Sequence, residues 1–159
     1  MKVAVAFDHR GVHLREAVLG VLSEHEVIDY GTDTDAVRLD YPDKAREVGG
    51  AIQHGLAERA VLVCGSGVGA SVAASKMLGI RASVCHDTYS AHQGVEHDEM
   101  NVLTLGSRVI GIEPAYECSI AFLGASFSGA PRHRRRFEKV LEIERLTIES
   151  GTEEADARP

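Results

Sequence analysis

The sequence predicts an α/β fold, a three-layer Rossmann-like sandwich with a five-stranded parallel sheet. Five short apolar runs of strand length alternate with segments whose apolar residues recur at helical spacing. Such alternation is typical of a parallel sheet with helices on both faces. The 159 residues contain no internal repeat and suffice for one core. We expect a single domain at residues 1–149 and a disordered acidic tail at residues 150–159.

The first half of the chain alternates strand and helix signals. An apolar run at residues 2–7 predicts the first strand. Apolar residues at i, i+3, i+4, i+7 and i+8 then predict a helix at residues 14–22. A short run at residues 26–30 predicts the second strand, and a proline suits the first turn of a helix at about residues 42–55. The β-branched run 60–63 predicts a buried third strand.

The second half continues the alternation. Helical spacing from residue 68 predicts a helix that Gly79 ends. Residues 80–85 predict the fourth strand, and Asp87 is a candidate cap for a helix over the polar stretch 88–100. The remaining strand and the last two helices are expected at residues 101–105, 114–123 and 132–149.

Charge and cysteine content exclude several function classes. A formal net charge of -7 disfavours binding to nucleic acid or to anionic membranes, which need a broad positive surface. No apolar run reaches the length of a membrane span, and the chain starts with a strand signal rather than a signal peptide. Cys64, Cys85 and Cys118 are odd in number and widely spaced, which indicates a reducing cytoplasm rather than a disulfide framework or a zinc cluster.

The glycine-rich loop after the third strand carries the clearest chemical signal. Gly65, Gly67 and Gly69 allow backbone N–H groups to crowd together, and a helix is expected to open at Val68. Such a loop suits an anion or a developing oxyanion. Cys64 at its mouth is then a candidate acid–base or nucleophilic group. The structural alternative is a tight turn that follows a buried cysteine.

Other polar groups follow the expected strands, whose carboxyl ends should share one edge of the sheet, where open α/β sheets bind ligands. Asp8 and His9 form an acid–base pair there, although the carboxylate alone would also suit a helix cap. Arg132 and Arg136 share a helix face suited to a phosphate, with Arg108 as a possible third contact. The alternative for the arginines is a solvated basic surface.

A dinucleotide site is a further alternative for the glycine loop. Gly65, Gly67 and Ala70 satisfy the pattern G-x-G-x-x-A. However, the loop follows the third strand rather than the first, and a cysteine precedes it. No acidic residue for a ribose follows a second strand at the expected distance. The sequence therefore disfavours a nicotinamide cofactor.

Taken together, these motifs resemble the ribose-5-phosphate isomerase B family, within a wider group that includes galactose-6-phosphate and allose-6-phosphate isomerases. The resemblance covers roughly residues 2–145. The matching segments are Asp8-His9-x-Gly11, Asp40-Tyr41-Pro42, Cys64-Gly65-Ser66-Gly67-Val68-Gly69, Ala73-Ala74-Ser75-Lys76, Gly79-Ile80-Arg81-Ala82, Asn101-Val102-Leu103, Gly106-Ser107-Arg108-Val109, and Arg132-His133 with Arg136.

The resemblance implies an aldose–ketose isomerase without metal or cofactor, acting on D-ribose 5-phosphate and D-ribulose 5-phosphate through a cis-enediolate. Cys64 would be the base, Ser66 and the loop amides would stabilise the enediolate, and His97 with Asp8 would open the sugar ring. It also implies a homodimer or a dimer of dimers with shared active sites. The substrate-binding residues implied by the match are His9, Tyr41, Gly65, Gly67, Val68, Gly69, Asp98, Arg108, Arg132 and Arg136.

Two positions depart from the family pattern. Asp98 stands where an asparagine is usual, so a carboxylate replaces an amide that can also donate. Arg10 stands where alanine is usual. Both changes favour considering another substrate, such as a tetrose 4-phosphate or an allose or galactose 6-phosphate. A catalytically silent sugar-phosphate-binding subunit is the remaining alternative.

Overall fold

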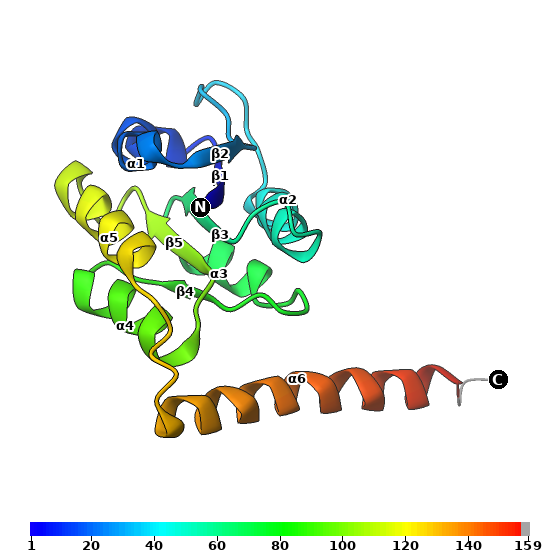
Figure 1. Cartoon of the computed structure of the whole chain (residues 1–159). Helices are drawn as coiled ribbons and strands as arrows, with labels where there is room; N and C mark the ends of the chain where they lie inside the picture. Colours follow the sequence, from blue (N-terminus) through cyan, green and yellow to red (C-terminus); the bar gives the residue numbers. More distant parts are fainter. Residues whose placement is uncertain (157–159) are drawn as a thin grey trace.

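A computed structural model describes residues 1–156, with side chains up to residue 150. A five-stranded, all-parallel sheet in the order β2-β1-β3-β5-β4 confirms the predicted fold class (Figure 1). The strands are β1 (Lys2–Phe7), β2 (Glu26–Asp29), β3 (Arg59–Cys64), β4 (Ala82–Val84) and β5 (Val102–Gly106). The helices are η1 (Gly11–Leu14), α1 (Arg15–Val21), η2 (Leu22–Glu24), α2 (Tyr41–Gln53), α3 (Val68–Ala74), α4 (Thr88–Asp98), α5 (Ile112–Gly124) and α6 (Pro131–Asp156).

The helices cover both faces of the sheet, as the alternating pattern predicts. Successive strand residues point to opposite faces, so β1 gives Val3, Val5 and Phe7 to one core and Ala4 and Ala6 to the other. The first core also takes buried side chains from α1, α4 and α5. The second is lined by small residues and takes its helical side chains from α2 and α3. Small side chains allow these two helices to approach the sheet closely.

The strand order reverses at the centre of the sheet. From β1 the chain adds β2 on one side and β3, β5 and β4 on the other, so the switch lies between β1 and β3. The register pairs Phe7 with Val63, and the Asp8 N–H donates to the Val63 carbonyl at 3.1 Å. In open α/β sheets a ligand crevice lies outside the strand ends at such a switch. The segments that follow β1 and β3 therefore lie where a ligand site is expected.

Three elements differ clearly in length from the prediction. Strand β4 covers only Ala82–Val84 of the expected residues 80–85. Helix α3 ends at Ala74, because residues 75–80 close tight turns in which the Met77 N–H donates to the Ala74 carbonyl at 3.0 Å. Helix α6 passes the expected end at residue 149 and reaches Asp156, and it projects from the three layers as a long arm (Figure 1). Disorder of residues 150–159 stays a prediction, and residues 157–159 lie outside the described part of the chain.

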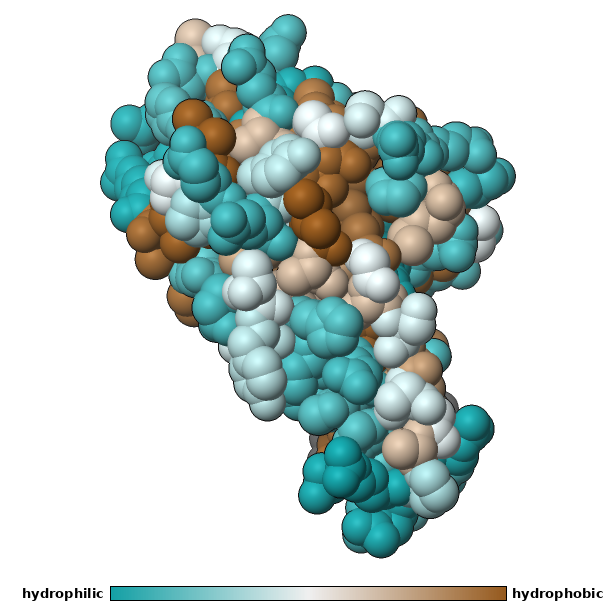
Figure 2. All heavy atoms as spheres, turned by 60° about the vertical axis from the view of Figure 1, so that its left-hand side comes forward, coloured by the Kyte–Doolittle hydropathy of each residue, from teal (hydrophilic) through white to brown (hydrophobic). Residues whose placement is uncertain are grey.

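The outer surface of α5 carries an apolar stripe. Ile112, Tyr116 and Ile120 are exposed and recur every fourth residue, so they lie along one side of the helix. Figure 2 turns this side of the molecule forward and shows apolar side chains gathered in its upper half, above a hydrophilic lower end. The stripe lies outside both cores, and its exposure makes it a candidate contact surface.

Candidate active site

Asp8 leaves the end of β1 as a buried carboxylate, with 4% of its surface exposed. Its Oδ1 accepts the backbone N–H groups of Arg10 at 2.8 Å and Gly11 at 2.7 Å. The capping role that the sequence left open is therefore real, since these bonds hold the start of η1. Oδ2 makes no hydrogen bond with the described residues, so one carboxylate oxygen remains for a ligand.

Cys64 ends β3 and faces the glycine loop. It is 4% exposed, and its Sγ accepts the Gly67 N–H at 3.2 Å. Gly67 has a left-handed φ of 79°, which turns the chain from the strand into α3. The thiol is thus both buried and directed at the loop amides, so the structural and chemical interpretations of this cysteine are compatible.

The glycine loop lies directly against the end of β5. A Cβ on Gly106 would come within 2.5 Å of the Ser66 carbonyl carbon, so only glycine fits there. The Ser107 N–H donates to the Cys64 carbonyl at 2.9 Å, and the Arg108 N–H donates to the Gly65 carbonyl at 3.0 Å. These bonds place the expected phosphate ligand Arg108 beside the loop.

Three further side chains surround the loop. The Tyr41 ring covers Gly69, where an added Cβ would lie 2.7 Å from the ring Cζ. The His9 Nδ1 lies 3.3 Å from the Leu39 backbone nitrogen, which holds the imidazole against the loop before α2. Arg10 lies over Gly65, since a Cβ there would come within 3.0 Å of the arginine Cδ. We call one set of predicted residues the thiol cluster: Asp8, His9, Tyr41, Cys64, Gly65, Ser66, Gly67, Val68, Gly69 and Arg108.

His86, which follows β4, also supports this region. Its Nε2 accepts the Gly106 N–H at 3.0 Å. Burial lowers the pKa of His86, with an opposing effect from Asp87, so the ring is kept neutral and able to accept. Asp87 caps α4 as predicted, because its Oδ1 accepts the Ser90 N–H at 2.7 Å.

The remaining predicted residues form a second group, which we call the arginine cluster: His97, Asp98, Arg132 and Arg136. The first two end α4 and the other two lie in the first turns of α6. The two helices meet here, where the rings of His97 and His133 stack with centroids 3.8 Å apart. Beyond its place in the matching segment Arg132-His133, the sequence predicts no role for His133. Its buried position reflects packing between segments far apart in the chain.

The two clusters lie at opposite edges of the sheet. Helix α4 runs back against the strand direction, and Asp98 stands just before the start of β5 at Val102. Cys64 instead pairs with Gly106 at the other end of β5. At about 3.3 Å per residue, β5 alone separates them by roughly 13 Å. The expectation that His97 works with Asp8 is therefore not met within one chain.

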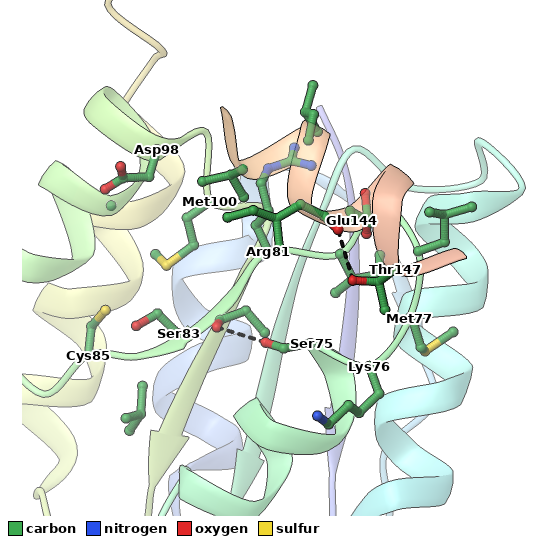
Figure 3. A pocket seen from close by; sticks show the side chains of 18 of the residues that line it. Ser75, Lys76, Met77, Arg81, Ser83, Cys85, Asp98, Met100, Glu144 and Thr147 are labelled. Atoms are coloured by element: carbon green, nitrogen blue, oxygen red, sulfur yellow. Dashed lines mark hydrogen bonds between the residues drawn. The ribbon is translucent and has the colours of Figure 1, made fainter. Parts of the chain in front are cut away.

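A cavity of about 920 Å³ lies between the projecting helix α6 and the edge strand β4 (Figure 3). Lys76, Met77 and Leu141 are among its lining residues, and Asp98 borders it. Helix α6 is held over the cavity by Glu144, whose Oε1 accepts the Gly79 N–H at 2.7 Å. Neither Cys64 nor the two cluster arginines line the cavity, and Asp98 is the one residue of the two clusters among its lining residues.

Among residues 1–156, no group of three or more His, Cys, Asp or Glu side chains is arranged to hold a metal ion. Within the same residues, no helix has both the length and the apolar character to cross a bilayer.

Comparisons with known proteins agree with the geometry. A family model described as Ribose/Galactose Isomerase matches residues 3–140. Ribose-5-phosphate isomerase B of Escherichia coli is 43% identical over 145 residues, covering 90% of this chain and 96% of that protein. D-erythrulose-4-phosphate isomerase of Pectobacterium atrosepticum is 37% identical over 131 residues, covering 81% of this chain and 86% of that protein.

A solved structure shows the same fold. Ribose-5-phosphate isomerase B of Clostridium thermocellum superposes with a TM-score of 0.87 at 39% identity, covering 92% of this chain and 99% of that one. The sequence match, the parallel sheet and the thiol at its switch point lead to one assignment. The chain belongs to the ribose/galactose isomerase family.

Proposed function

We propose that this protein interconverts D-ribose 5-phosphate and D-ribulose 5-phosphate. The observation that carries the proposal is the buried Cys64 thiol, directed at the amides of a glycine loop at the switch point of the sheet. The activity named for the Escherichia coli relative supports the choice of sugar. Aldose–ketose isomerisation moves one proton between neighbouring carbons, which a single base beside an oxyanion site can do.

The reaction follows from the thiol cluster. With the sugar in its open form, the Cys64 thiolate takes the proton from C2 of the aldose, and the C1 carbonyl oxygen becomes the negatively charged oxygen of a cis-enediolate. The loop amides from Gly65 to Gly69 and the Ser66 hydroxyl stabilise that charge. The thiol then returns the proton to C1, while the proton of the C2 hydroxyl passes to the C1 oxygen, which leaves a hydroxyl at C1 and the ketose carbonyl at C2.

The arginine cluster serves a second copy of the chain in this proposal. His97, Arg132 and Arg136 lie too far from their own Cys64, so ring opening and phosphate binding need the partner's cluster. The apolar side of α6 supports this arrangement, since Val140, Leu141, Ile143 and Leu146 are all exposed on the arm. We therefore propose a homodimer with shared sites, and the exposed stripe on α5 offers a second contact for a dimer of dimers.

We place the protein in the reducing cytoplasm. All three cysteines are unpaired, and the proposed chemistry requires Cys64 as a free thiol. An oxidising compartment would expose that thiol to disulfide formation or oxidation.

Asp98 favours a second class of substrate. An ionised carboxylate only accepts hydrogen bonds, so it would select a different hydroxyl pattern from the amide usual at this position. The relative from Pectobacterium atrosepticum is named for a four-carbon sugar phosphate. The alternative is therefore an isomerase of a tetrose 4-phosphate or of a hexose 6-phosphate, and a silent binding subunit would bind such sugars without turnover.

Initial rates of isomerisation test the proposal. The panel contains ribose 5-phosphate, erythrose 4-phosphate, allose 6-phosphate and galactose 6-phosphate, each followed by ketose formation. A kcat/KM highest for ribose 5-phosphate is the expected result. A higher value for another sugar would transfer the assignment to it, and no turnover of any sugar by the assembled protein would contradict the enzyme assignment.

A further inference from the structure

We propose that His133 is a positioning residue that holds His97 and Arg132 in one fixed unit as a neutral imidazole. This inference rests on the proposed function, in which His97 opens the sugar ring and Arg132 binds its phosphate. His133 contacts neither the thiol cluster nor the reacting atoms of the sugar. It acts through His97 and Arg132.

Both ring nitrogens of His133 are occupied. Nε2 lies 2.9 Å from the Arg132 Nε, which carries a hydrogen and can only donate. Nε2 must therefore be unprotonated. Nδ1 then carries the hydrogen and donates to the Ser128 hydroxyl at 2.6 Å. With only 3% of the residue exposed, this one neutral tautomer satisfies both contacts.

The hydrogen bond to His133 fixes the plane of the Arg132 guanidinium. It engages Nε, so the two terminal amino groups remain available for two oxygens of a phosphate. Arg136 lies one helical turn further on and can add a second guanidinium. A long arginine side chain loses less conformational freedom on binding when its direction is already set.

His97 is fixed from two sides. Its ring stacks on His133 with an interplanar angle of 37°, and the Gln93 amide donates to its Nδ1 at 2.7 Å. The proton of a neutral His97 is thereby assigned to Nε2, the nitrogen free for proton exchange with a sugar oxygen. The Glu96 carboxylate lies 3.8 Å from this nitrogen and can stabilise the ring when it is charged.

The surroundings keep His133 neutral. Burial lowers its pKa most, and the neighbouring His97, Arg132 and Arg136 lower it further, while Glu96 has the opposite effect. Protonation would place a hydrogen on Nε2 and break the contact with Arg132. The backbone also secures this geometry, because the Ser128 N–H donates to the Glu96 carbonyl at 3.0 Å and so ties the start of α6 to the end of α4.

Two substitutions separate the two functions of His133. His133→Phe keeps a ring against His97 but removes the acceptor for Arg132, so KM for ribose 5-phosphate should rise about tenfold with a smaller change in kcat. His133→Gln keeps an acceptor for Arg132 but removes the stacked ring, so kcat should fall about tenfold with a smaller change in KM. The matched controls are His25→Phe and His25→Gln. His25 precedes β2, the outer strand on the opposite side of the sheet from β4.

Equal changes of kcat and KM in the two variants, or no change in either, would overturn the inference. A second measurement does not depend on activity or on the variants folding. Two-dimensional ¹H–¹⁵N spectra of the wild-type histidine rings should show His133 neutral with its proton on Nδ1 at pH 8 and at pH 7. A charged ring or the other tautomer overturns the inference, whereas an inactive wild-type enzyme with the expected spectrum contradicts only the proposed function.

Discussion

Replacing Gly67 with alanine tests how tightly the glycine loop packs against the sheet. Gly67 has a φ of 79°, and an alanine in this left-handed conformation costs about 1 kcal/mol. The new Cβ would also lie 2.8 Å from Val84 Cγ2 and 3.1 Å from the Leu105 carbonyl carbon. Overpacking of this kind costs about 1–3 kcal/mol. The free energy of unfolding should therefore fall by about 2–4 kcal/mol.

Gly55 provides the matched control. It has a φ of 68°, and an added Cβ would meet nothing within 4 Å. Gly55→Ala therefore carries only the backbone cost of about 1 kcal/mol. Urea denaturation of both variants measures the difference, which should be about 1–3 kcal/mol and represents the packing of the loop alone.

Activity gives a second readout of the same change. The Gly67 N–H donates to Cys64 Sγ, so any shift of the loop moves a donor that orients the proposed base. Turnover should fall in Gly67→Ala and stay near the wild-type value in Gly55→Ala. Equal unfolding free energies in the two variants, together with an unchanged kcat, would refute the close packing described here.

Four further results are expected. Cys64→Ala should abolish most turnover and leave sugar-phosphate binding largely intact, since the thiol acts mainly in the transition state; wild-type turnover would contradict its role as base. Arg136→Ala should chiefly raise KM for phosphorylated sugars, and an unchanged KM would argue against phosphate binding. Asp98→Asn should change the ratio of kcat/KM between five-carbon and four-carbon sugar phosphates, and a constant ratio would show that the position does not set specificity. The free energy of unfolding should decrease as pH falls below about 6.5. Burial lowers the pKa values of His86 and His133, so the unfolded chain binds more protons than the folded one in this range. The same decrease in a double His86→Gln, His133→Gln variant would show that other groups cause the pH dependence.

The sequence predicted those features that depend on neighbours along the chain. Strand and helix periodicity gave the α/β order, and the glycines after β3 marked the loop that receives Cys64. Strand order and the length of α6 depend on packing between distant segments, which local periodicity does not encode. His133 shows the limit most clearly, because its partners His97 and Ser128 come from α4 and from the segment before α6. The residues next to it in the sequence do not distinguish it from a surface histidine.

Strand β3, which ends at Cys64, also anchors the segment of the chain that leads to Arg132. Arg59 starts β3, and Cys64 ends it. The Arg59 guanidinium donates to the carbonyls of Phe122 at 2.6 Å and Ala125 at 2.8 Å, which closes the unpaired end of α5 just before the chain leads to Arg132. Cys64 therefore lies at one end of β3, and the segment that leads to Arg132 is anchored at the other end. A second copy can complete both sites at once only if that spacing is constant, so the cap by Arg59 supports the shared-site arrangement.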